Sequence, residues 1–104
     1  MYEYTAIMNH VVDGDTINLT IDLGFRMTMT ANCRLAGINA PEMRSSTGEQ
    51  SKEYLIGLMN EKTPLKIISK KLDKYGRPVV EIIKGNKNIN QIMLINGMAA
   101  EYKD

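Results

Sequence analysis

Four charged residues in three separate segments carry the chemistry that cleavage of a phosphodiester bond needs. Asp15 follows an Asp-Gly pair, and Arg34 and Glu42 lie on either side of a Gly- and Pro-containing segment. Arg77 follows the turn-like residues 73–76. Guanidinium groups donate paired hydrogen bonds to phosphate oxygens and stabilise a five-coordinate phosphorus. One carboxylate can hold a hard cation and the other can deprotonate a water, so the set predicts a phosphodiester-cutting site.

Each of these residues also has a purely structural interpretation. An Asp-Gly pair between two strands is a strong hairpin signal, so Asp13 is assigned to the turn. Asp15 lies just past that turn, where a strand begins and where carboxylates are depleted. Arg34, Glu42 and Arg77, taken singly, are typical of solvated surfaces and loops. The functional interpretation is favoured because the two carboxylates and two arginines together supply every group that phosphodiester cleavage needs.

The elements that must position these residues begin with strands. Apolar and polar residues alternate through residues 17–23 and again through residues 25–35, which is the period of a half-buried strand. Arg34 belongs to the polar set of the second strand, so we expect it on the face opposite the core. Residues 22–24, Asp-Leu-Gly, provide the turn between these strands. A further strand is expected over residues 4–12.

An amphipathic helix is expected over residues 47–61. Its apolar residues repeat with helical spacing, namely Tyr54, Leu55, Leu58 and Met59. Ser46 or Thr47 is expected to cap its N-terminus. Glu49 or Gln50 would then complete a capping box.

A second, short helix is expected over residues 89–96. Asn88 or Asn90 can cap its N-terminus, because both have side-chain oxygens that accept backbone hydrogen bonds. Gly97 is suited to the position after its end.

Strand character resumes over residues 65–71 and 77–84, on either side of the turn 73–76. Five strands, with one helix inserted after the third and a short helix at the end, predict a small α+β protein. Its strands are expected to form a closed barrel with the helices outside. The sequence has no internal repeat or linker, so residues 1–104 are expected to form a single domain.

Composition narrows the class of protein. The formal net charge of +1 is low for a nucleic-acid-binding protein. The single Cys33 cannot form an internal disulfide, and the single His10 gives no basis for a zinc site. No apolar run approaches the roughly 20 residues of a transmembrane helix. These features favour a cytoplasmic protein without membrane contact, or an excised domain, for which secretion stays open.

Lysines concentrate between residues 62 and 87. They are Lys62, Lys66, Lys70, Lys71, Lys74, Lys84 and Lys87. The cluster fits two interpretations, a solvated strand surface and a patch that faces substrate.

Together, the segments at 12–16, 34–42 and 73–77 resemble the staphylococcal nuclease, or thermonuclease, family. Further similarity lies at residues 48–49 and 89–99, in the same order. The resemblance implies an OB-fold barrel with attached helices. It also implies calcium-dependent cleavage of DNA or RNA, with products that end in a 3′-phosphate.

The resemblance assigns catalytic roles to Glu42, Arg34 and Arg77. Glu42 would be the general base that activates water, and the two arginines would bind the scissile phosphate. Lys74 and Tyr75 match positions that contact a nucleotide's second phosphate. Tyr102 is a looser match to a tyrosine that stacks on the substrate or hydrogen-bonds to it, so these last residues are the substrate-binding candidates.

The same resemblance places a Ca²⁺ ion on Asp15, with the backbone carbonyl of Ala40 as a further ligand. Asn39 stands where the family usually carries a second metal-binding Asp. An amide oxygen can ligate calcium, but it contributes no negative charge. We therefore expect a weaker metal site than two carboxylates would form.

The expected partner is single-stranded DNA or RNA, and the sequence does not choose between them because backbone contacts carry no sugar preference by themselves. A monomer is expected, with a homodimer left open. Two other functions also remain open. One is an OB-fold module that binds single strands without cutting them. The other is a protein-interaction domain, which the near-neutral charge would suit.

Overall fold

The computed structural model describes residues 2–59 and 64–103. Residues 60 and 61 of the first predicted helix, and Lys62 of the lysine cluster, lie outside the described residues. The strands are β1 (Tyr2–Asp13), β2 (Thr16–Gly24), β3 (Met27–Leu35), β4 (Ile38–Asn39), β5 (Leu65–Leu72), β6 (Pro78–Lys84), β7 (Lys87–Asn88) and β8 (Ala100–Glu101). The helices are α1 (Ser46–Leu58) and α2 (Ile89–Ile95).

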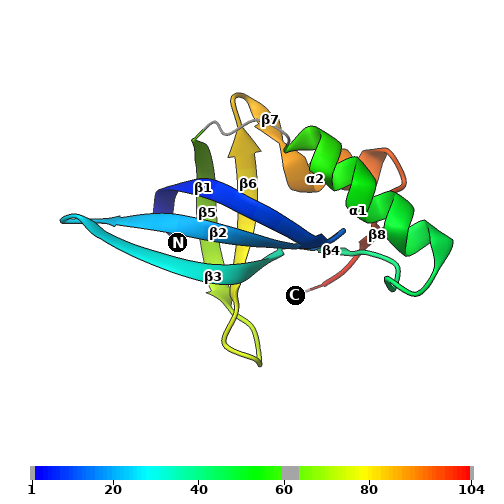
Figure 1. Cartoon of the computed structure of the whole chain (residues 1–104), viewed down its shortest axis with the longest axis horizontal. Helices are drawn as coiled ribbons and strands as arrows, with labels where there is room; N and C mark the ends of the chain where they lie inside the picture. Colours follow the sequence, from blue (N-terminus) through cyan, green and yellow to red (C-terminus); the bar gives the residue numbers. More distant parts are fainter. Residues whose placement is uncertain (1, 60–63, 104) are drawn as a thin grey trace.

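The long strands close into a barrel. Their order is β3-β2-β1-β5-β6, and β3 pairs with β6 to complete the circle. That closing pair is parallel and joins Arg34 to Val79 and Leu35 to Val80, whereas the other long pairs are antiparallel. The predicted α+β class and the five-stranded OB-type barrel are confirmed (Figure 1). The two-residue strands β4, β7 and β8 were not predicted, because they are too short to show any periodicity.

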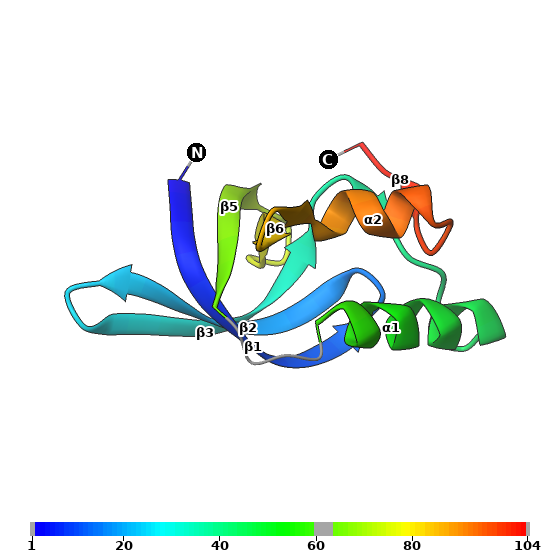
Figure 2. The same ribbon diagram turned by 90° about the horizontal axis from the view of Figure 1, so that it is seen from above.

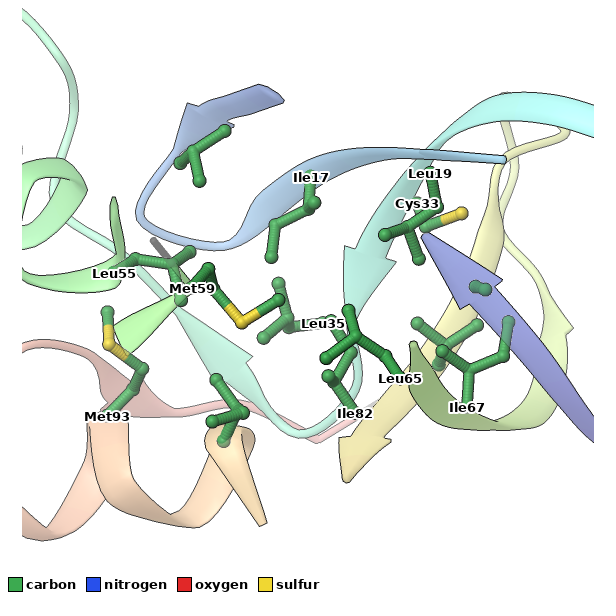
Figure 3. Close-up of a cluster of buried hydrophobic side chains, with 14 of the residues drawn as sticks. Ile17, Leu19, Cys33, Leu35, Leu55, Met59, Leu65, Ile67, Ile82 and Met93 are labelled. Carbon is green, nitrogen blue, oxygen red and sulfur yellow. The ribbon is translucent and has the colours of Figure 1, made fainter. Parts of the chain in front are cut away.

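One hydrophobic core fills the barrel and extends under both helices (Figure 3). The alternation predicted for β2 is confirmed, since Ile17 and Leu19 are fully buried. Leu55 and Met59 from the α1 region and Met93 from α2 pack against the same cluster. Each such side chain contributes about 1.5–3 kcal/mol on burial, which holds the helices against the barrel.

The N-cap of the first helix precedes both of the predicted caps. Ser45, in an extended conformation, is its N-cap and accepts a hydrogen bond from the Gly48 N–H at 3.0 Å. The predicted caps, Ser46 and Thr47, are therefore wrong. The predicted capping box is wrong as well, because the third helical residue is Gly48, which has no side chain to reach back.

The second helix agrees with one of the two predicted caps. Asn88 is the N-cap and accepts from the Gln91 N–H at 3.1 Å. The other candidate, Asn90, is buried and bridges the barrel instead. Its side-chain amide donates to the carbonyl oxygens of Ala36 and Val80 at 2.9 and 3.1 Å, so it ties α2 to the closure of β3 on β6.

The β2–β3 hairpin projects away from the two helices (Figures 1 and 2). The predicted turn at residues 22–24 and the predicted strand start at Phe25 are wrong. Strand β2 continues through Gly24, and Phe25 and Arg26 form the turn, with φ of 53° and 63°. Phe25 is 99% exposed, so the alternation of the sequence does not bury the hairpin tip.

We expect the double substitution Phe25→Asn, Arg26→Gly to stabilise the protein by about 1–2 kcal/mol. Positive φ is costly for Phe and Arg, whereas Asn-Gly is the preferred pair for a two-residue hairpin turn. Urea unfolding followed by circular dichroism measures the change. Phe25→Ala alone is the control, because it removes the exposed ring but keeps a non-Gly residue at positive φ. Equal or lower stability of the double variant would contradict the explanation.

Candidate active site

Arg77 is held by the turn between β5 and β6. The carboxylate of Asp73 accepts hydrogen bonds from the backbone N–H groups of Tyr75 and Arg77, both at 2.9 Å. Its other oxygen accepts from Nε of Arg77 at 2.7 Å. Partial burial alone would raise the pKa of Asp73, but these hydrogen bonds and the charge of Arg77 lower it. Arg77 was predicted as the first strand residue, but it belongs to the turn, where a single carboxylate fixes both its backbone and its side chain.

Arg34 approaches the same region from β3. It is partly exposed between the buried residues Cys33 and Leu35, so it lies on the face opposite the core, as predicted. Its guanidinium carbon lies 4.7 Å from the centroid of the Tyr102 ring. One of its terminal nitrogens donates to the side-chain oxygen of Asn39 at 3.4 Å. The parallel pairing of Arg34 with Val79 places it beside the turn that carries Arg77.

The two arginines line one pocket, of about 310 Å³, which we call the arginine pocket. The sequence candidates that line it are Arg34, Lys74, Tyr75, Arg77 and Tyr102. The Tyr75 ring contacts two cations, with the Lys74 ammonium 5.2 Å and the Arg77 guanidinium carbon 5.5 Å from its centroid. Cations from β3 and from the β5–β6 turn therefore converge on one concave surface, an arrangement suited to an anion such as a phosphate.

Asp15 lies at the start of β2, beside the segment that leads to Glu42. Its carboxylate accepts hydrogen bonds from the Ala40 N–H at 2.9 Å and from the Thr16 hydroxyl at 3.0 Å. Burial alone would raise the pKa of Asp15, but hydrogen bonds from Asp13, Ala40 and Thr16 and the charge of Arg34 lower it. Asp15 is therefore a charged oxygen donor at neutral pH.

Asp13 contacts Asp15 in two ways, and only one of them is the predicted turn hydrogen bond. It does accept the turn hydrogen bond from the Asp15 N–H, at 3.0 Å. In addition, burial and a side-chain hydrogen bond with Asp15 raise the pKa of Asp13 to about 6. The sequence signal for this contact was present, since the two carboxylates are separated by a single glycine.

Two glycines allow the loop that carries Glu42 to lie close to the barrel. A Cβ on Gly14 would lie 2.0 Å from the Ser51 hydroxyl and 2.8 Å from Cβ of Ala40. A Cβ on Gly48 would lie 1.9 Å from the carbonyl oxygen of Glu42. Only glycine fits at either place, so the start of α1 determines where the backbone of Glu42 lies.

The side chain of Glu42 is exposed and is not among the residues that line the arginine pocket. Its carbonyl oxygen accepts from the Ser45 hydroxyl at 2.7 Å, which fixes the backbone next to the helix cap. Glu42 thus follows shortly after Ala40, which hydrogen-bonds to Asp15, while the Glu42 side chain is exposed to solvent.

A cation at Asp15 would lie near more than one carboxylate. Asp15 supplies a carboxylate, the Asp13 side chain hydrogen-bonds to it, and the Ala40 N–H donates to it. Asn39 is exposed on β4, and its amide oxygen accepts from Arg34. Within residues 2–59 and 64–103, no three or more His, Cys, Asp or Glu residues cluster as a metal site. Carboxylate and amide oxygens are suitable ligands for a hard divalent cation, and Asp15 and Asn39 carry these groups.

The lysine cluster divides between two roles. Lys71 and Lys74 line the arginine pocket, which fits the interpretation as a patch that faces substrate. Lys84 instead donates to the carbonyl oxygen of Leu58 at 2.9 Å, close to the end of α1.

No helix in the described part of the chain is long and apolar enough to cross a membrane.

The family model of staphylococcal nuclease homologues matches residues 32–104, a range that includes Arg34, Glu42 and Arg77 but not Asp15. Protein ParB of Escherichia coli is 30% identical over 102 residues, which are 89% of this chain and 54% of that protein. An uncharacterised endonuclease of Haemophilus influenzae is 32% identical over 93 residues, 89% of this chain and 49% of that protein.

A micrococcal nuclease of Shigella flexneri is 30% identical over 102 residues, which are 89% of this chain and 55% of that protein. The chain thus spans about half the length of these relatives. The matched range of the family model includes both helices and the strands from β4 to β8.

Proposed function

Because the chain belongs to the staphylococcal nuclease family, we propose that it is a nuclease that hydrolyses phosphodiester bonds in single-stranded DNA or RNA. The observation that carries the proposal is the convergence of Arg34, from β3, and Arg77, from the β5–β6 turn, in one pocket. Each side chain can donate paired hydrogen bonds to a phosphate. The relatives that are named nucleases or endonucleases support the same chemistry.

In the proposed reaction, Arg34 and Arg77 hold the scissile phosphate and stabilise the charge that develops on its oxygens. Glu42 takes a proton from a water as the water attacks phosphorus in line with the leaving 5′-oxygen. The P–O5′ bond breaks as the new P–O bond forms, and the leaving 5′-oxygen takes up a proton from solvent water, so the products are a 3′-phosphate and a 5′-hydroxyl. Lys74 and Tyr75 bind a neighbouring phosphate, and Asp73 positions Arg77 through its hydrogen bonds.

We propose Ca²⁺ as the cation at Asp15, with Asn39 and the backbone of Ala40 completing its protein ligands. When bound, the cation would polarise a phosphate oxygen. The low pKa of Asp15 supports this assignment, because the carboxylate is available without first losing a proton.

One digestion experiment tests the proposed function. The wild-type protein is incubated with denatured DNA and with single-stranded RNA, in calcium or in excess chelator, and the ends of the products are identified. Cutting that needs calcium and leaves 3′-phosphates supports the proposal. Binding of the same strands without cutting would support the alternative of a non-catalytic OB-fold module, and neither cutting nor binding would overturn both.

We expect Asn39→Asp to tighten Ca²⁺ binding by about tenfold, because a second carboxylate adds negative charge to the donor set. Calorimetric titration with calcium measures the affinity. Asn86→Asp is the matched control, since it makes the same change of charge on an exposed loop beyond β6. Equal affinities for wild type and Asn39→Asp would show that residue 39 is not a ligand.

A further inference from the structure

Strand β3 has one edge that is open over most of its length. On one side it pairs with β2 from Met27 to Arg34. On the other side it pairs with β6 only through Arg34 and Leu35. Among the strands of the described chain, none pairs with that side of residues 27–33. The projecting β2–β3 hairpin therefore presents a row of backbone N–H and C=O groups that can pair with a further strand (Figure 1).

This edge lacks the features that usually prevent strand pairing. Natural edge strands are commonly very short or carry Lys or Pro. The other terminal strand of the sheet follows this rule, because β7 has two residues and one of them is Lys87. Residues 27–33, Met-Thr-Met-Thr-Ala-Asn-Cys, contain no charge and no Pro. Two copies of this stretch can therefore pair without placing like charges opposite each other.

The hairpin also exposes apolar side chains on the face that continues the core. Ile21 and Met29 lie opposite each other in the β2–β3 pair. Ile21 is buried, but Met29 is 40% exposed and Met27 is 62% exposed. Leu23, near the end of β2, is 41% exposed. The apolar face of the hairpin thus extends beyond the part that the barrel covers.

An apolar hollow of about 230 Å³ lies between the hairpin and strands β5 and β6. Its lining includes, from the hairpin and from the β5–β6 pair, Leu23, Met29, Leu72 and Pro78. Phe25, at the hairpin tip, is 99% exposed, so its ring does not fill the hollow of its own chain. An exposed ring and an apolar hollow on the same chain are complementary surfaces for two copies of that chain.

The area of this surface indicates how strong such an association is. Four exposed apolar side chains of the hairpin contribute, namely Leu23, Phe25, Met27 and Met29. At about 200 Å² for a fully exposed side chain of this size, they present on the order of 500 Å². A standard interface buries about 800 Å² on each partner. The backbone edge and the exposed polar side chains of β3 add to the apolar area, so the surface suits a weak dimer.

We propose that two copies of this chain form a symmetric dimer in which residues 27–33 of the two β3 strands pair antiparallel, edge to edge. The two-fold axis is perpendicular to the joined sheet, so the apolar faces of both hairpins lie on the same side. The open stretch is centred on Thr30, and the axis passes beside that residue. The Phe25 ring of each copy packs against the hollow of the other. The dimer is independent of the proposed function, because no hairpin residue from 23 to 33 lines the arginine pocket.

Sedimentation equilibrium of the wild-type chain tests the association. A dissociation constant on the order of 10 µM is expected for an interface below the standard size. The chain should therefore be mainly monomeric at about 1 µM, the range used for circular dichroism, and mainly dimeric at about 300 µM. A monomer at the higher concentration would overturn the proposal and leave this edge to a strand of another protein.

Two substitutions test the interface. Met27→Lys is expected to raise the dissociation constant about 100-fold, because it places like charges on the two paired edges. Phe25→Ala is expected to raise it about tenfold, since the ring no longer reaches the hollow. Ile95→Lys is the matched control, because Ile95 is an exposed apolar residue of α2, and it should leave the dimer unchanged. Equal dissociation constants for wild type and Met27→Lys would contradict the interface.

A disulfide tests the antiparallel pairing itself. Residues opposite each other in antiparallel strands have Cα atoms about 4.5–5.5 Å apart, which a disulfide can bridge. Thr30→Cys is therefore expected to give a linked dimer under mild oxidation. Thr5→Cys is the control, because Thr5 is exposed on β1, a strand that already pairs on both sides.

The native Cys33 does not interfere with this measurement. It is buried, and burial raises the pKa of its thiol to about 11, so it stays unreactive. Linkage of the Thr30→Cys variant alone supports the pairing. A wild-type dimer whose Thr30→Cys variant does not link, or equal linkage of the Thr5→Cys and Thr30→Cys variants, would overturn it.

Discussion

Replacing Glu42 with Gln is expected to lower turnover of denatured DNA by about 10²–10⁴-fold, the usual contribution of a general base. The amide has the same shape as the carboxylate but cannot take a proton from the attacking water. Because the Glu42 side chain is exposed, the substitution removes no packing, and its effect on stability should stay within about 0.5 kcal/mol. The loss should therefore be chemical and not structural.

The measurement is kcat and KM on denatured DNA in saturating calcium, together with an unfolding curve for each variant. Glu53→Gln is the matched control, because Glu53 is an exposed carboxylate within α1 and outside the arginine pocket. The control should retain wild-type turnover. If Glu42→Gln digests DNA at the wild-type rate, another group is the base, and the exposed position of Glu42 outside the arginine pocket has only a structural meaning.

Replacing Arg77 with Lys is expected to lower kcat by about 10²–10³-fold, similar to the loss of one preorganised oxyanion donor. Lys keeps the charge but loses the planar fork that donates two hydrogen bonds to one phosphate. It also loses the Nε–H that donates to Asp73 at 2.7 Å, so the side chain is no longer held by the turn. Both effects act on the same phosphate contact.

Steady-state kinetics on denatured DNA distinguishes a contact made in the transition state from one made in substrate binding. Loss of a contact made mainly in the transition state lowers kcat more than it raises KM. Arg26→Lys, at the tip of the β2–β3 hairpin, is the control and should have no effect. Asp73→Asn adds a second comparison, with a smaller loss expected because Arg77 keeps its guanidinium and loses only its anchor. Wild-type kcat for Arg77→Lys would show that charge alone is sufficient at this position.

Local patterns along the chain were enough for much of the fold. The alternation at residues 17–23 predicted a strand with buried Ile17 and Leu19, because a period of two directs alternate side chains to one face. Asn88 was one of the two predicted caps of the second helix, because short polar side chains satisfy free N–H groups at a helix start. Both features depend on neighbours only a few residues away.

The errors occurred where particular contacts, and not helix propensity or periodicity, decide where an element begins. The first helix starts after Ser45, whose hydroxyl accepts from the Gly48 N–H, while Gly48 packs against the backbone of Glu42. The hairpin turns at Phe25 and Arg26 because the pairing of β2 with β3 sets the register, although Gly24 carries the better turn chemistry. Asn90 was a plausible cap, yet the barrel closure uses it as a buried bridge.

By itself, the sequence determined which side chains are available for chemistry, namely Asp15, Arg34, Glu42 and Arg77, and the period of the elements that carry them. Only the tertiary structure decided that Arg34 and Arg77 share one pocket, because the parallel β3–β6 pair that joins them links residues far apart in the chain.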